Sequence, residues 1–374
     1  MVSTPQKVYE LGQSLWYDNI ERRLLENGEL KAMIERGDIY GVTSNPSIFH
    51  NAIVNSSDYD EELKRLAKEG ASANEIFDRL AVQDIQAAAD LFLPLYESTN
   101  GGDGYVSIEV HPDMAHDVDG TSEEAERLWA LVDRPNLMVK IPATKEGLPA
   151  IQRSIAKGIN INITLIFSRQ RYDEVIDAYL SGLEERASKG KEISGIASVA
   201  SFFVSRIDGK VDGWLEELVR EEGPQADKAA QLRGKIAVAN AKLAYELFQT
   251  RFSDDRFAAL KEKGGRAQRP LWASTSTKNA DYPDVLYLDE LIGPDTVNTV
   301  PPKTLEAFKD HGRAELSIER ALDEAHRAMT DLDAVGLSLD KATDELEDEG
   351  VAAFSKAIHA LIDTIEERRV AFIG

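Results

Sequence analysis

The sequence predicts an α/β fold, a (β/α)8 TIM barrel with an additional helical insertion and C-terminal helices. Eight short β-rich runs alternate with segments of helical periodicity, which is typical of a parallel sheet covered by helices. No glycine-rich phosphate loop follows any run, and this disfavours the rival doubly wound open sheet. The eight runs are residues 12–18, 38–45, 104–110, 136–144, 161–167, 195–205, 269–275 and 295–301.

Three of the connecting segments carry clear helix signals. Ser72 and Glu75 have the spacing of a capping box, and apolar residues follow at helical intervals. Ser168 precedes a second apolar stripe, for which Gly190 is a plausible stop. A third stripe is formed by Leu232, Ile236, Ala239, Leu243 and Leu247.

The domain organisation follows from what the sequence lacks. No Pro/Gly/Ser-rich linker and no internal repeat divides the 374 residues. A single barrel of this length with insertions is a common size. We therefore expect one domain over residues 1–374, with a helical insertion at about 215–268 and a helical C-terminal region at about 302–374.

Composition limits the partners and the compartment. The net charge of −23 disfavours nucleic acid and anionic membrane surfaces, which need clustered Lys and Arg. The absence of cysteine removes thiol nucleophiles and cysteine-ligated zinc, and it fits a reducing cytoplasm. No signal peptide or membrane-spanning stretch is recognisable, so we expect a cytoplasmic protein. The six histidines show no HxH or HExxH spacing, so no metal site is predicted.

Lys140 lies in the middle of a short apolar run, NLMVKIPAT at 136–144. Burying an ammonium group is costly, and a lone lysine in a strand most often extends its charged end to water. Removal from water also favours the neutral amine, which can attack a carbonyl carbon and form a Schiff base. Lys140 is therefore a candidate nucleophile.

Schiff-base chemistry also needs an acid and a base within hydrogen-bond reach. Asp18 and Glu109 lie in two other β-rich runs. Each carboxylate alone could equally be a helix cap or an ion-pair partner. Because the carboxyl ends of barrel strands meet on one face, two carboxylates and a lysine on three strands favour a catalytic site.

Five motifs, spread in order along the chain, resemble the successive strand motifs of the transaldolase family. The phrases LWASTSTKN and LIGPDTVNTVPPKTLEAF resemble its longer bacterial members. The resemblance implies a class I aldolase without metal or cofactor, whose substrates are small sugar phosphates. The five motifs are GVTSNPSIF at 41–49, SIEV at 107–110, VKIPAT at 139–144, NITLIFS at 162–168 and SFFVSRI at 201–207.

The reaction that the resemblance implies belongs to the non-oxidative pentose phosphate pathway. A dihydroxyacetone unit moves from sedoheptulose 7-phosphate or fructose 6-phosphate to glyceraldehyde 3-phosphate or erythrose 4-phosphate. By resemblance, Lys140 forms the Schiff base at C2 of the donor. Glu109 works with a water that Thr164 helps to hold, and Asp18 is the base on the C4 hydroxyl during C3–C4 cleavage.

The remaining site residues are also carried over by resemblance. The substrate-binding set is Thr43, Asn45, Asn162, Ser201 and Phe203, and the phosphate-binding set is Arg206 and Lys278 with Ser274 or Ser276. Many transaldolases have an arginine where this chain has Lys278. Lysine supplies the charge without the planar fork of a guanidinium, so the geometry there should be looser.

Two alternatives stay open on the sequence. One is a fructose-6-phosphate aldolase that releases free dihydroxyacetone, which Glu109 and the chain length disfavour. The other is a non-catalytic barrel that binds sugar phosphates, which does not explain a buried amine. The sequence leaves open whether the protein is a monomer or a homodimer.

Overall fold

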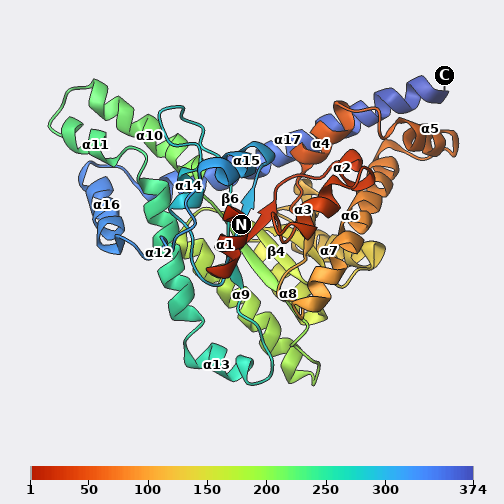
Figure 1. Ribbon diagram of the computed structural model, residues 1–374, viewed down its shortest axis with the longest axis horizontal. Coiled ribbons are helices and arrows are strands. Elements are labelled where there is room, and N and C mark those ends of the chain that lie inside the picture. The colour runs from red at the N-terminus through yellow and green to blue at the C-terminus, as the bar shows by residue number, and fades with distance from the viewer. Residues whose placement is uncertain (1, 374) are drawn as a thin grey trace.

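The computed structural model describes residues 2–373 and shows an α/β fold around one curled parallel sheet. Its seven strands have the order β1-β7-β6-β5-β4-β3-β2, and every pair is parallel. The curvature and the surrounding helices are consistent with a TIM-barrel-like fold (Figure 1). The strands are β1 (Gln13–Tyr17), β2 (Val106–Glu109), β3 (Leu137–Pro142), β4 (Ile161–Ile166), β5 (Ser198–Phe203), β6 (Arg269–Ala273) and β7 (Thr296–Val300).

The run at 38–45 differs from the prediction, because the described chain forms no full strand there. Val42 makes single parallel bridges to Tyr17 of β1 and to Val106 of β2, so it links the two edge strands. The pairing is short because the chain turns into a helix at Asn45, and the following proline has no N–H to donate. Gly41 allows the close approach, since a Cβ there would lie 2.7 Å from the Trp16 ring.

The strands form the core of the molecule. Every residue of β1, β3, β4, β5 and β7 is buried, as expected for parallel strands covered on both faces. One face of the sheet packs against helices, and polar side chains such as Gln13, Asn162 and Asn298 are fully buried within the curled sheet. The sequence runs that looked like buried strands are therefore confirmed in all but the 38–45 segment.

The helices surround the sheet (Figure 1). Those before β6 are α1 (Thr4–Glu10), α2 (Arg22–Glu26), α3 (Glu29–Glu35), α4 (Pro46–Val54), α5 (Asp60–Lys68), α6 (Ala73–Ser98), η1 (Pro112–Met114), α7 (Val118–Val132), α8 (Gly147–Lys157), α9 (Arg169–Ser188), α10 (Ser205–Arg220), α11 (Ala226–Leu232), α12 (Ile236–Arg251) and α13 (Asp255–Lys261). Those after β6 are α14 (Leu286–Asp289), α15 (Pro302–His311), α16 (Leu322–Ala334) and α17 (Leu339–Ile373). None of the helices in residues 2–373 is long and apolar enough to span a bilayer.

The helix signals in the sequence have mixed outcomes. The capping box of Ser72 and Glu75 is present at the start of α6, and Ser168 caps α9 through the N–H of Arg171. The third stripe is wrong as a single helix, because α11 ends at Leu232 and α12 begins at Ile236. Gly234 makes this break with φ of +68°, a conformation that other residues rarely adopt.

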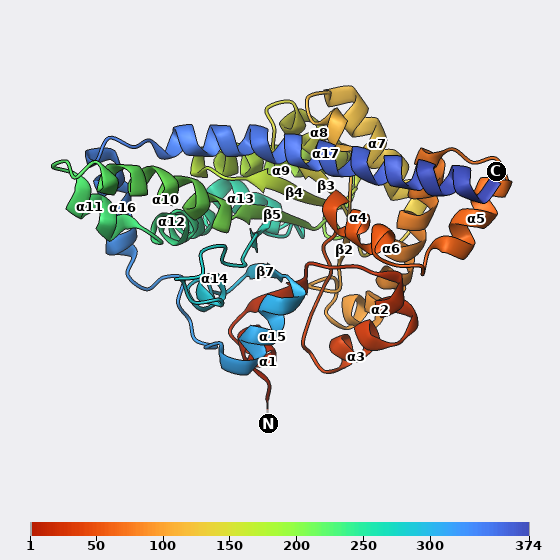
Figure 2. The same ribbon diagram turned by 90° about the horizontal axis from the view of Figure 1, so that it is seen from above.

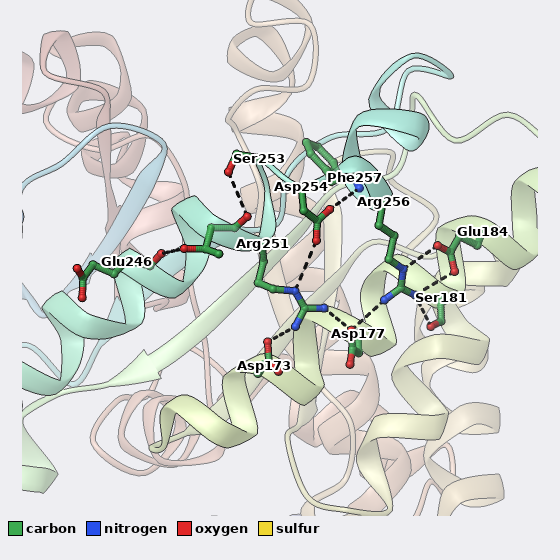
Figure 3. A network of polar contacts seen from close by, with 11 residues as sticks. Asp173, Asp177, Ser181, Glu184, Glu246, Arg251, Ser253, Asp254, Arg256 and Phe257 are labelled. Atoms are coloured by element: carbon green, nitrogen blue, oxygen red, sulfur yellow. Dashed lines mark hydrogen bonds and ion pairs between the residues drawn. The ribbon is translucent and has the colours of Figure 1, made fainter.

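The helices α12 and α13 are fastened to α9 by a network of ion pairs (Figure 3). Arg251 pairs with Asp173 and Asp177, and Arg256 pairs with Asp177 and Glu184. The carboxylates are about half exposed, so each pair contributes roughly 0–1 kcal/mol. The network fixes the position of these helices more than it stabilises the fold.

The longest helix, α17, runs along one side of the molecule (Figure 2). It contacts α10 and α16 at one end and α4 and α5 at the other, and it touches β4 in between. Leu346, Gly350 and Phe354 are buried on its inner face. This face covers the end of the sheet where β4 and β5 finish.

Candidate active site

Three predicted site residues lie side by side across adjacent strands. The register pairs Glu109 of β2 with Lys140 of β3, and Lys140 with Asn162 of β4. The Lys140 Nζ lies 3.4 Å from Glu109 Oε2, and each side chain is only 6% exposed. The same Nζ donates a hydrogen bond of 2.9 Å to the carbonyl oxygen of Ser44. The amine is thus buried beside the Glu109 carboxylate.

Burial dominates the electrostatics of both carboxyl groups. It raises the pKa of Glu109, and the positive charge of Lys140 only partly offsets this effect. Burial also raises the pKa of Asp18, while the Thr43 hydrogen bond and the charges of Lys140 and Lys278 act the other way. Asp18 as a whole is half-buried and lines the cavity. Both groups can therefore hold a proton at a higher pH than a carboxyl group in water.

Asp18 is oriented by a short chain of hydroxyl groups. The Thr43 hydroxyl donates to Asp18 Oδ1 at 2.7 Å and lies 2.5 Å from the hydroxyl of Thr299. Because a hydroxyl has one proton and Thr43 gives it to the carboxylate, Thr299 must donate to Thr43. These two hydrogen bonds hold the Asp18 carboxylate in position through Thr299 of β7.

A cavity opens at this end of the sheet and collects most of the predicted residues. Glu109 and Asn162 do not line it: Glu109 borders a neighbouring cavity that it shares with Asn45, and Asn162 is paired with Lys140 on the adjacent strand. Four lining residues were not predicted. The lining consists of Asp18, Thr43, Asn45, Lys140, Thr164, Ser201, Phe203, Arg206, Ala273, Ser274, Ser276, Lys278, Thr299, Pro301 and Phe354.

The two asparagines are partly used by protein neighbours. Asn45 Oδ1 caps α4 by accepting from the N–H of Ile48, so its amide NH2 is left to donate. Asn162 accepts from the Ser201 hydroxyl at 2.6 Å and donates to Ser107 at 3.1 Å. The Ser201 hydroxyl is therefore held by Asn162 at the cavity wall.

The cavity is also lined by two cations. Arg206 and Lys278 form no ion pair with any residue within 2–373, although acidic side chains outnumber basic ones in this chain. The Arg206 guanidinium lies near two aromatic rings, 5.2 Å from the centroid of Phe203 and 5.9 Å from that of Phe354. Two cations without carboxylate partners in a cavity form a site for an anion.

The serines beside these cations differ in their partners. Lys278 donates to the Ser276 hydroxyl at 2.7 Å, and the Ser274 hydroxyl lies 2.8 Å from that of Ser205. Ser274 also has φ of +56°, a strained backbone conformation that is often found at functional sites. Both serines line the cavity.

Two buried oxygen atoms near the amine lack a hydrogen-bond partner among the described protein atoms. They are Thr164 Oγ1 and Glu109 Oε2, the latter apart from its 3.4 Å ion pair with Lys140. Buried polar atoms are nearly always satisfied by protein or by water. This part of the site therefore suits a bound water.

The residues that sequence reasoning missed differ in how they could have been found. Thr299 is a polar residue at the end of a predicted strand, so the rule that selected Asp18 would also have selected it. Phe354 comes from α17, and nothing in its local sequence indicates a role in the cavity. No group of three or more His, Asp or Glu side chains in the part of the chain that the structure covers is placed to hold a metal ion.

Comparison with known proteins identifies the family of the chain. The family model described as Transaldolase/Fructose-6-phosphate aldolase matches residues 15–365. A transaldolase of Thermobifida fusca is 46% identical over 372 residues, which cover 99% of this chain and 100% of the relative. Transaldolases of Saccharopolyspora erythraea and Trichodesmium erythraeum are 47% and 45% identical, over 98% and 97% of this chain and 98% and 96% of their own. The chain belongs to the Transaldolase/Fructose-6-phosphate aldolase family.

Proposed function

We propose that this protein is a transaldolase that moves a dihydroxyacetone unit from a ketose phosphate to an aldose phosphate through a Schiff base on Lys140. The observation that carries the proposal is the buried Lys140 amine beside Glu109, at a cavity that is also lined by Asp18 and by two cations, Arg206 and Lys278, without ion-pair partners among residues 2–373. We also infer that the segment around Val42 completes an eight-stranded barrel within a single domain of residues 1–374, with the insertion and the C-terminal helical region as predicted.

Formation of the Schiff base needs a neutral amine and a source of protons. The raised pKa of Glu109 allows this carboxylate to take the proton of Lys140. The neutral Nζ then attacks C2 of the donor ketose, and the carbonyl oxygen becomes the hydroxyl of a carbinolamine. Glu109, through a water held by Thr164, protonates this hydroxyl so that it leaves as water.

Cleavage of the sugar uses the second carboxylate. Asp18 removes the proton of the C4 hydroxyl, the C3–C4 bond breaks, and its electron pair moves into the iminium to form an enamine. The aldose phosphate leaves, and an acceptor aldose phosphate takes its place. The enamine attacks the new aldehyde carbon, and Asp18 returns its proton to the oxygen that forms. Separate carboxylates are reasonable because the two steps move protons at different atoms.

The remaining groups hold the substrate. The amides of Asn45 and Asn162 and the hydroxyls of Ser201 and Thr43 suit the hydroxyl groups of the dihydroxyacetone unit. Phe203 closes one wall and keeps the enamine from water, which favours transfer over release. Arg206 and Lys278 bind the phosphate, with Ser274 or Ser276 adding a hydroxyl donor.

The test is reductive trapping with borohydride in the presence of fructose 6-phosphate. We expect one adduct, on the peptide that contains Lys140, and none in Lys140→Met. Lys242 is an internal control, because it is also buried and paired with a carboxylate, Glu290, at 2.9 Å but lies outside the cavity. An adduct on Lys242 or on surface lysines, or no adduct at all, would remove the mechanism.

Transfer is distinguished from release by the acceptor. Fructose 6-phosphate should be consumed rapidly only when erythrose 4-phosphate or glyceraldehyde 3-phosphate is available to take up the dihydroxyacetone unit. Rapid formation of free dihydroxyacetone would instead indicate an aldolase. The cysteine-free composition supports a place in the cytoplasm, where these sugar phosphates are available.

A further inference from the structure

Buried residues recur at intervals of four along the inner face of α17. Leu346, Gly350 and Phe354 are all buried, and residues at this spacing share one face of a helix. Most of α17 packs on other helices, but this segment faces β4, the strand that carries Thr164, and α10, which follows the strand that carries Ser201. The segment therefore lies over the candidate active site.

Gly350 brings α17 unusually close to the site. A Cβ at this position would lie 2.9 Å from a methyl carbon of Leu165 and 3.6 Å from Nη1 of Arg206. Leu165 itself has φ of +59° at an irregularity in β4, so the contact lies where the strand is distorted. Because Gly350 has no side chain, the backbone of α17 can lie close to the Arg206 guanidinium.

Two ion pairs between α10 and α17 stabilise the close approach of α17 to Arg206. Lys210 of α10 lies 2.5 Å from Glu345 and 2.8 Å from Glu349, both on α17. Since Arg206 begins the same helix α10, the pairs tie α17 to the element that carries the arginine. Glu349 is thus engaged by Lys210, and Arg206 keeps no carboxylate partner among residues 2–373.

Phe354 follows one turn after Gly350 and faces the same guanidinium. It is 5% exposed and lines the cavity, and its ring centroid lies 5.9 Å from the Arg206 guanidinium, which is also 5.2 Å from that of Phe203. Two aromatic rings close to a guanidinium attract the cation and limit its movement, while its N–H groups can still donate to a phosphate. We propose that Phe354 is a positioning residue that fixes Arg206 for the phosphate group of the sugar.

This inference rests on the proposed function and adds a residue from the far end of the chain to it. A cation–π contact at a partly buried site changes an equilibrium constant by about 2- to 30-fold. We expect Phe354→Ala to raise KM for fructose 6-phosphate about tenfold and to leave kcat within about twofold. The value of kcat/KM for fructose, which lacks the phosphate, should change less than twofold.

Three further variants separate positioning from packing. Phe354→Tyr keeps the ring and should restore KM, whereas Phe354→Leu keeps an apolar side chain without a ring and should not. Leu361→Ala is the matched control, because Leu361 is fully buried on α17 but lies away from the cavity. It should lower Tm without changing the ratio of kcat/KM for fructose 6-phosphate to that for fructose.

The decisive measurement is a double-mutant cycle with Arg206→Ala. If Phe354 acts through Arg206, adding Phe354→Ala to Arg206→Ala should change KM for fructose 6-phosphate by less than twofold. A further tenfold rise, or an equal loss with fructose, would overturn the inference. Borohydride trapping on Lys140 in the wild-type protein is checked separately, so a failure of the proposed function is distinguishable from a failure of the role of Phe354.

Discussion

Replacing Asp18 by asparagine separates the two carboxylates that the mechanism uses. The change keeps the size of the side chain, and an amide oxygen can still accept the 2.7 Å hydrogen bond from Thr43. It removes the group that takes the C4 proton and leaves the Lys140–Glu109 pair intact. We therefore expect Schiff-base formation to continue and C3–C4 cleavage to stop.

General acid–base groups contribute about 10²- to 10⁴-fold to a rate, so kcat for transfer should fall by that factor. The trapped adduct should change as well. In wild-type protein, borohydride should capture the three-carbon unit on Lys140, and in Asp18→Asn it should capture the intact six-carbon sugar phosphate. In Glu109→Gln, by contrast, the adduct itself should form slowly, because that carboxylate serves imine formation.

The same substitution should stabilise the fold at neutral pH. Burial raises the folded-state pKa of Asp18 above 3.8, so the wild-type protein loses stability as the pH rises through that raised pKa. Asparagine carries no such cost. A typical gain for relieving a functional site is about 1 kcal/mol. With an unfolding entropy of about 2.1 cal/mol/K per residue, this raises the Tm of a chain of 374 residues by about 1.3 °C.

The assays are peptide mapping of the borohydride adduct by mass spectrometry, and thermal unfolding of both proteins between about pH 4 and pH 8. The Tm difference should grow in favour of the variant as the pH rises. A kcat within tenfold of wild type, or a three-carbon adduct in Asp18→Asn, would show that another group is the base for cleavage. A Tm difference that does not depend on pH would refute the electrostatic part of the reasoning.

Two further predictions concern Lys278 and Asp208. Lys278→Met should lower kcat/KM for fructose 6-phosphate by about 10- to 150-fold, which is the contribution of one hydrogen bond from a charged group. Lys278→Arg keeps the charge and should change kcat/KM by less than about threefold. A methionine variant as active as the wild-type protein would exclude a contact between Lys278 and the phosphate. Burial raises the pKa of Asp208 to about 6, although the N–H of Ala237 and the Tyr287 hydroxyl offset part of this. Wild-type stability should therefore fall relative to Asp208→Asn as the pH rises from about 4 to about 7, by at most about 3 kcal/mol. Thermal unfolding across this range measures it, and parallel Tm profiles would contradict it.

The strands and the charged residues of the candidate active site were predictable for the same reason. Parallel strands buried on both faces read as apolar runs, and polar residues at their carboxyl ends must meet on one face. Asp18, Glu109 and Lys140 stand out because each is a charged residue in such a run. The register then places Glu109 and Lys140 side by side without help from any loop.

The features that escaped prediction depend on tertiary packing. The stripe from Leu232 to Leu247 has one period throughout, and only the glycine at 234, pressed against Tyr282, divides it into two helices. The run at 38–45 has strand composition, but Asn45 and Pro46 start a helix before the pairing can extend. Phe354 is an ordinary apolar residue of a helix until the path of α17 brings it to Arg206.

The position of α17 also has a consequence for how the protein is made. Its residues, 339–373, follow all seven described strands in the chain, and they pack against α4, α5 and α6, which precede β2, so these contacts can form only after the strands have been synthesised. A nascent chain that has just released β7 holds Asp18, Glu109 and Lys140 but has no cover over Arg206. The candidate nucleophile and the proposed phosphate-binding cations are thus all synthesised before the helix that covers Arg206, and a chain that stops after β7 would contain these groups with the guanidinium less restricted.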